Sequence, residues 1–157
     1  MLAGRKAIIL AVLAFGGAAL WLTLAREESP AGFLPYLDAR VVAQGARIYE
    51  AHCAACHGEN LEGEADWEIR RPDGRLPAPP HDETGHTWHH PDAQLFFMTK
   101  YGVAPLVGEG YQSDMPAYEG VLDDAEIIAV LAFIKSRWPE EIRHWHNDLN
   151  RLTDSGG

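Results

Sequence analysis

The chain has 157 residues, of which 46% are hydrophobic and 23% charged, the composition of an ordinary globular protein. Its 23 acidic residues outnumber its 13 basic ones, so the formal net charge is −10. Such a surface argues against binding to nucleic acid and favours a partner protein with a basic docking patch, although a simple gain in solubility would also explain it.

The N-terminal segment is strongly apolar. Arg5 and Lys6 precede 19 uncharged residues, 7–25, which as a helix at ~1.5 Å per residue would span ~28 Å. This length matches the ~30 Å hydrocarbon core of a membrane. We therefore expect residues 1–25 to form a transmembrane anchor in the inner membrane, with everything after Ala25 on the periplasmic side. A signal peptide cleaved after Ala25 is the alternative, and both interpretations predict export.

The segment after the anchor is expected to change from linker to helix to loop. Residues 26–37 contain two prolines and a glycine and are predicted to be a linker. Asp38 can cap a helix that runs to about Ala54. Residues 58–80 show no sustained periodicity and are predicted to be a loop, with a short turn near 65–69. The predicted helix carries these residues along one side: Val41, Val42, Gly45, Ile48 and Tyr49.

The remaining segments complete an all-α pattern. A proline begins a helix over residues 91–101, and the following residues, 102–120, are predicted to be a second irregular loop. One of two adjacent aspartates caps the clearest helix, 125–138, and a proline ends it. A short amphipathic helix is expected within residues 139–157, and its apolar face would consist of Ile142, Trp145, Leu149 and Leu152.

The most informative motif is Cys53-Ala54-Ala55-Cys56-His57. Two thiols at this spacing can form thioether bonds to the vinyl groups of one haem, and the histidine that follows can ligate the iron. The chain has no other cysteine, so a four-thiolate zinc site is impossible and a mixed site would need distant histidines. No strand-helix-strand pattern supports a thioredoxin-like pair. The motif therefore predicts one covalent haem c bound by Cys53, Cys56 and His57.

A second axial ligand is expected from the loop before the last predicted long helix. Met115 stands in Ser-Asp-Met-Pro-Ala-Tyr, where Pro116 favours an extended backbone and the polar neighbours give a methionine little reason to be core. Met98 lies inside the helix 91–101 and is expected to pack. We predict Met115 as the distal ligand, with a histidine or an open site as alternatives. Ligation by His and Met leaves no free position on the iron, as in an electron carrier without a small-molecule substrate.

The motif, its flanks and the helix at 125–138 resemble the class I c-type cytochromes over residues 38–138. Gly45 and Tyr49 resemble the glycine and aromatic pair of that family's first helix. The resemblance implies an all-α fold of about four to five helices around one haem, in which the glycine allows the first and last helices to cross closely. Residues 139–157 would then be a C-terminal helical extension. The residues that resemble the family's last helix are Val130, Ala132, Phe133 and Lys135.

The resemblance also implies how the proximal histidine is oriented. In the family, a downstream proline carbonyl accepts a hydrogen bond from the ring nitrogen that does not face the iron. Pro77, Pro79 and Pro80 are candidates here, and Pro79 or Pro80 fits best within Ala-Pro-Pro-His. A purely stiffening role for these prolines is the alternative.

Residues 81–90 hold four of the eight histidines. As a solvated loop beside the haem edge, this segment would let Trp88 or a histidine donate a hydrogen bond to a haem propionate. The alternative is a second metal site for copper, because clustered imidazoles with Asp82 suit copper or zinc. Its candidate ligands are His81, His86, His89 and His90.

Three functional hypotheses follow. The first is an exported, membrane-anchored cytochrome with one haem, which carries single electrons between respiratory or other redox partners. The second is a copper-binding module that uses the histidine segment 81–90 with the haem as its redox partner. The third is an enzyme in which a labile Met115 opens the iron to peroxide or a gas.

Overall fold

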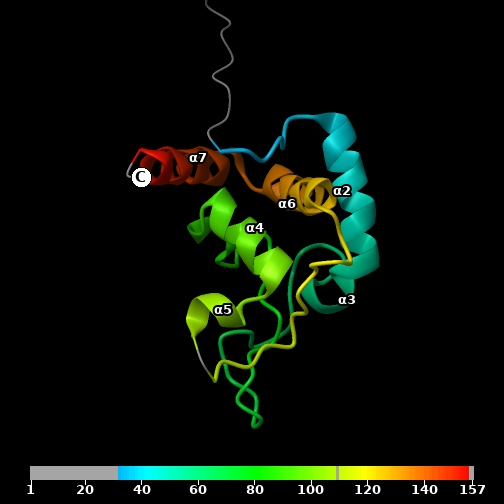
Figure 1. Ribbon diagram of the computed structural model, residues 1–157, viewed down its shortest axis with the longest axis vertical. Helices are drawn as coiled ribbons and strands as arrows, with labels where there is room; N and C mark the ends of the chain where they lie inside the picture. Colours follow the sequence, from blue (N-terminus) through cyan, green and yellow to red (C-terminus); the bar gives the residue numbers. More distant parts are fainter. Residues whose placement is uncertain (1–31, 109, 156–157) are drawn as a thin grey trace, which may run out of the picture.

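The computed structural model describes residues 32–108 and 110–155, and these residues are all-α, as predicted (Figure 1). No strand occurs within the described ranges; a single bridge joins Glu119 and Leu122. The helices, in chain order, are α2 (Ala39–His52), α3 (Ala54–His57), a short 3-10 helix η1 (Thr87–His89), α4 (Asp92–Tyr101), α5 (Ala104–Val107), α6 (Asp124–Arg137) and α7 (Glu140–Asp154).

The predicted transmembrane segment, residues 7–25, lies outside the described residues, as do linker residues 26–31. Among the helices that the structure describes, none combines the length and the apolar character needed to cross a membrane.

Helix starts follow the capping residues of the sequence. The carboxylate of Asp38 accepts hydrogen bonds from the backbone N–H groups of Arg40 and Val41 at 2.9 and 3.4 Å. Of the two aspartates before α6, Asp123 is the cap, and it forms a reciprocal capping box with Glu126. These side chains satisfy backbone donors that the first turn of a helix leaves without partners, which is why both helices begin where predicted.

Three boundaries differ from the predicted ones. Helix α2 ends at His52, because Cys53 leaves the helical conformation (φ −120°, ψ −39°), and the motif occupies its own turn in α3. The predicted loop 102–120 contains the one-turn helix α5, which ends at Gly108. Helix α7 was expected to be short but has 15 residues.

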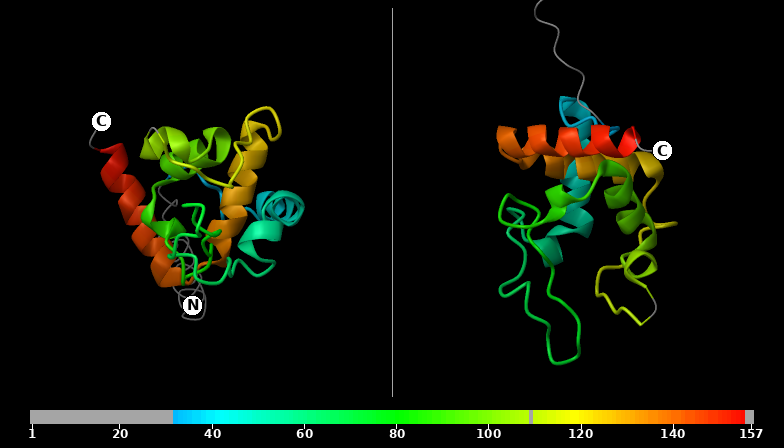
Figure 2. Two further views of the ribbon diagram at one scale, coloured as in Figure 1. Left: turned by 90° about the horizontal axis from the view of Figure 1, so that it is seen from below. Right: turned by 90° about the vertical axis from the view of Figure 1, so that its left-hand side faces the viewer.

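Helices α2 and α6 pack closely where α6 crosses α2 (Figures 1 and 2). A Cβ atom at Gly45 would lie 1.9 Å from the carbonyl oxygen of Ala129, so only glycine allows this approach of the two backbones. Tyr49 then packs on Phe133, with ring centroids 5.4 Å apart. The close crossing predicted from the resemblance is therefore present, and the cysteine motif follows directly at the C-terminal end of α2.

The buried face of α7 is polar, which is not the face that the sequence pattern predicts. Trp145 and Leu152 are 46% and 72% exposed, whereas His146, Asn147 and Asn150 are buried. Of the predicted apolar stripe, Ile142 packs against the hydrophobic core, so the stripe accounts for only part of the packing of this helix.

A buried carboxylate, Asp92, explains this orientation of α7. The side-chain oxygen of Asn150 accepts a hydrogen bond of 2.8 Å from the backbone N–H of Asp92. His146 Nδ1 lies 3.7 Å from the carboxylate of Asp92. Lys135 Nζ of α6 lies 3.6 Å from the same carboxylate, and burial lowers the pKa of Lys135 while Asp92 opposes that shift. A buried carboxylate needs such partners, so the polar side chains of α7 turn inward.

Candidate functional site

His57 is the last residue of α3, and its side chain is buried. Its Nδ1 atom lies 2.8 Å from the carbonyl oxygen of Pro79. Burial lowers the pKa of His57, and the Pro79 hydrogen bond and the nearby charge of Glu64 oppose this shift. With Nδ1–H donating to Pro79, the neutral ring keeps its lone pair on Nε2, where a metal can bind.

The three candidate prolines differ in their contacts, and one of them is hydrogen bonded to His57. Only the carbonyl of Pro79 among them is hydrogen bonded to His57, whereas the carbonyl of Pro80 accepts a hydrogen bond from the hydroxyl of Thr87 at 3.4 Å. Pro77 lies in the wall of a neighbouring hollow.

The two thiols of the motif are free and differ in exposure: Cys53 is half-buried and Cys56 is exposed. Burial, with a smaller effect from Cys56, raises the pKa of Cys53 to about 11. A thiol that stays protonated at neutral pH is a poor metal ligand and a poor redox nucleophile. Cys53 is therefore poorly suited to thiolate chemistry.

Met115 lies in the loop between α5 and α6 and packs, half-buried, against the hydrophobic core. The hydroxyl of Tyr118 donates a hydrogen bond of 2.6 Å to the carbonyl of His52, the last residue of α2. This bond ties the loop to the segment that leads into the cysteine motif. Burial raises the pKa of Tyr118 to about 12, so the hydroxyl remains a donor. Met98 also packs on the core, but from within α4.

Two buried N–H groups fit the propionates of a haem. Trp88 Nε1 and Arg75 Nε are both buried, and neither has a hydrogen-bond partner within the described part of the chain. A buried donor without an acceptor costs free energy, on the order of 1–3 kcal/mol, which a bound carboxylate would remove. The sequence pattern indicated Trp88; it did not indicate Arg75, whose only signal is a position in the loop before the prolines.

The alternative of a copper site in the histidine segment 81–90 finds no support in the structure. In the residues that the structure describes, no group of three or more His, Cys, Asp or Glu side chains is placed to hold a metal ion. His86 stacks on Trp67 with centroids 5.2 Å apart, and His89 lies against Trp88 at 3.9 Å. The ring of His90 meets the edge of His86 and is hydrogen bonded to the side chain of Gln94. The rings turn toward different aromatic neighbours instead of toward one point.

His81 has a separate place, beside the proximal histidine. Its ring stacks on that of His57 with centroids 3.9 Å apart, and its Nδ1 lies 2.7 Å from the hydroxyl of Thr87. Its carbonyl accepts a hydrogen bond from the indole of Trp138 in α6. Burial, together with the neighbouring histidines, lowers the pKa of His81 well below its usual value. A neutral, packed ring of this kind supports His57 from the side.

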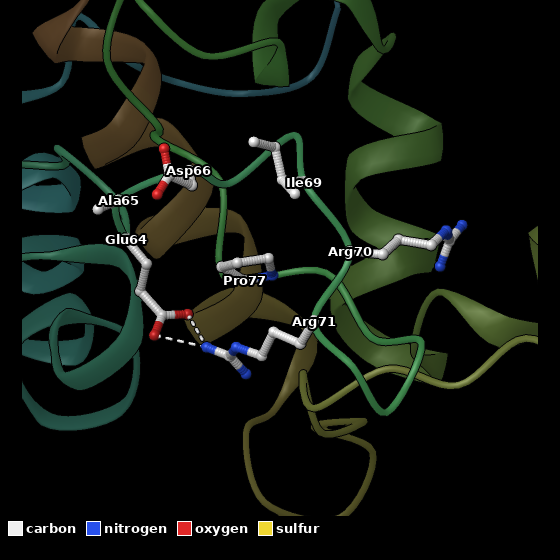
Figure 3. A pocket seen from close by; sticks show the side chains of 7 residues that line it. All are labelled: Glu64, Ala65, Asp66, Ile69, Arg70, Arg71 and Pro77. Carbon is white, nitrogen blue, oxygen red and sulfur yellow. Dashed lines mark hydrogen bonds and ion pairs between the residues drawn. The ribbon is translucent and has the colours of Figure 1, made fainter.

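A hollow lies on the first loop, next to the proline segment (Figure 3). On its floor Arg71 donates two hydrogen bonds to the carboxylate of Glu64, at 2.7 and 2.9 Å. The hollow is lined by Glu64, Ala65, Asp66, Ile69, Arg70, Arg71 and Pro77.

Three curated proteins similar to this chain are named as subunits of cbb3-type cytochrome c oxidases. A cbb3-type cytochrome c oxidase subunit CcoP of Azospirillum sp. (strain B510) is 32% identical over 97 residues, 62% of this chain and 29% of that protein. The subunit FixP of Bradyrhizobium sp. (strain ORS 278) is 27% identical over 115 residues, 73% of this chain and 34% of that protein. CcoP of Azospirillum brasilense is 31% identical over 97 residues, 62% of this chain and 28% of that protein.

The chain spans about a third of the length of these relatives. No solved structure matches it significantly. Residues 42–138, more than half of the chain, fit the family model described as cytochrome c. This range includes the attachment motif, the Pro79 carbonyl, Met115 and the crossing of α2 and α6. The chain therefore belongs to the cytochrome c family and carries covalently bound haem c.

Proposed function

We propose that this protein is an exported cytochrome with one haem, which carries single electrons and is held at the inner membrane by residues 1–25. The observation that carries the proposal is the buried imidazole of His57, the last residue of the Cys-x-x-Cys-His motif. This ring is hydrogen bonded to the carbonyl oxygen of Pro79. This arrangement orients a neutral ring with one nitrogen committed to the protein and the other available to iron.

In this proposal Cys53 and Cys56 hold the haem through thioether bonds, and His57 is the proximal ligand. When bound, the haem supplies an iron that exchanges one electron at a time. The protein's contribution is to keep the His57 ring neutral and aligned, by burial, by the Pro79 hydrogen bond and by the stacked ring of His81.

Met115 is the proposed distal ligand. Its loop position, its half-buried side chain and the tie from Tyr118 to the end of α2 support this role. A sulfur ligand opposite an imidazole raises the reduction potential and leaves the iron without an open position. That coordination favours an electron carrier over a peroxidase or a gas-binding enzyme.

Trp88 and Arg75 are proposed to donate hydrogen bonds to the haem propionates. Their buried N–H groups supply two donors for two carboxylates that would otherwise be poorly solvated. Arg75 would also offset negative charge within an acidic protein.

Redox proteins are the proposed partners. The relatives named as cbb3-type oxidase subunits suggest a terminal oxidase or a reductase in the same electron-transfer chain. The net charge of −10 favours a partner with a basic docking patch, because opposite charges speed the encounter of two proteins.

The electron-carrier proposal can be tested with the haem-loaded full chain in detergent. We expect it to take up one electron per haem reversibly and to reduce a basic soluble cytochrome rapidly. The rate should fall as salt is raised from low concentration to about 1 M, where the Debye length is ~3 Å. An acidic cytochrome of similar potential is the control and should react slowly with little loss on adding salt. Peroxide turnover or carbon monoxide binding by the unaltered protein would instead indicate an enzyme or a sensor.

The anchor can be tested on membranes from cells that express the full chain. We expect the protein to stay in the membrane pellet after washing with alkaline carbonate, because a hydrophobic helix is removed only by detergent. A periplasmic cytochrome without such a segment should be released by the same wash. Recovery of a soluble form that begins at Arg26 would show a cleaved signal peptide instead of an anchor.

A further inference from the structure

An ion-pair network joins the two loops that flank the proposed haem site. It consists of Glu64, Arg71 and Arg75 from the first loop and Asp114 from the second. Besides its two bonds to Glu64 (Figure 3), Arg71 donates to Asp114 Oδ2 at 3.1 Å. Arg75 Nη1 lies 3.3 Å from Asp114 Oδ1. Each oxygen of Asp114 therefore faces a different arginine of the opposite loop.

One end of the network reaches the support of the proximal histidine. The backbone N–H of Glu64 donates to the carbonyl of Ala78 at 2.9 Å, and the N–H of Ala78 donates to the Glu64 carboxylate at 2.6 Å. Ala78 immediately precedes Pro79, whose carbonyl is bonded to His57. Glu64 thus holds the backbone that orients the proximal ring.

The other end reaches the methionine. Asp114 is the residue directly before Met115, so the two arginines hold the chain one residue away from the sulfur-bearing side chain. On the far side of Met115 the loop is fixed by the hydrogen bonds of Tyr118 to His52 and Thr99. Between these anchors Met115 is held from both directions, and Asp114 provides the upstream one.

We infer that Asp114, clamped by Arg71 and Arg75, is a positioning residue that keeps Met115 on the iron. This inference rests on the proposed function, in which Met115 is the distal ligand. Both arginines are 38% exposed and Asp114 is 50% exposed, so each pair is partly screened by water. Losing two half-exposed pairs should raise the frequency with which Met115 leaves the iron by about 3- to 10-fold.

The test uses the haem-loaded full chain and its Asp114→Asn variant, with imidazole as an external ligand. Imidazole can bind the ferric iron only after Met115 has left, so its limiting binding rate reports the opening of the loop. We expect this rate to rise about 3- to 10-fold in Asp114→Asn. High salt should accelerate the parent and change the variant less, because salt screens the charges that the variant has already lost.

Asp73→Asn is the matched control. Asp73 also pairs with Arg75, at 3.7 Å, but it lies in the same loop and does not cross to the methionine. Its imidazole rate should equal that of the parent. Equal rates in the parent and Asp114→Asn, or an equal rise in both variants, would overturn the inference. If the parent shows no sulfur-to-iron charge-transfer band, the Met115 assignment itself fails, a result distinguishable from failure of the clamp.

Discussion

Replacing both Cys53 and Cys56 by alanine is expected to leave a protein from which acidic acetone extracts all of the haem. Thioether bonds survive this extraction, whereas a haem held only by His57 and packing does not. The parent protein should keep its haem on the polypeptide through the same treatment. Absorbance of the precipitated protein at the haem bands measures the difference directly.

The two single variants are the controls for this experiment. Cys53→Ala and Cys56→Ala each leave one thiol, so each should retain covalent haem through one thioether, at reduced yield. Haem that stays attached in the double variant would contradict attachment through these thiols.

The second large effect is expected for Met115→Ala. Loss of the sulfur should abolish the weak charge-transfer band at the red end of the ferric spectrum and let the reduced protein bind carbon monoxide. The reduction potential should fall by roughly a hundred millivolts or more, a fraction of the ~0.8 V that haem axial ligands span. Absorption spectra and a redox titration check both results.

Met98→Ala is the matched control for Met115→Ala. Met98 is partly buried and packs on the same core from α4, so its loss should lower stability by about 0.5–3 kcal/mol while leaving the spectrum and the potential in place. A normal spectrum in Met115→Ala, or a lost band in Met98→Ala, would move the ligand role away from Met115.

Local chemistry explains the features that could be predicted from the sequence. The haem-attachment motif consists of adjacent residues, and the caps Asp38 and Asp123 act on the next turn of the chain. The close crossing at Gly45 could also be predicted, although from a resemblance and not from local chemistry. Gly45 stands where the family's first helix has a glycine, and only a residue without a side chain allows this approach.

The histidine segment 81–90 shows what composition alone leaves open. Four imidazoles within ten residues allowed a copper site as an alternative to a loop beside the haem edge. In the folded chain, Trp67, Trp88 and His57 each receive one of these rings, so no three can point at one ion. Which neighbour a ring meets depends on segments far away in the sequence.

Long-range polar contacts decided the orientation of α7 and the way in which the two loops beside the proposed haem site are joined. Asp92 and Asn150, 58 residues apart, turn the polar side of α7 inward against the expectation from its apolar stripe. Arg71 and Asp114, 43 residues apart, join the loops on either side of the proposed haem site. The identity and spacing of neighbouring residues therefore determined the cofactor, the residues at which helices begin and the all-α fold class. The partners of buried and half-buried charges depended on the tertiary fold, because a charge removed from water is paired by whichever groups the packing brings to it.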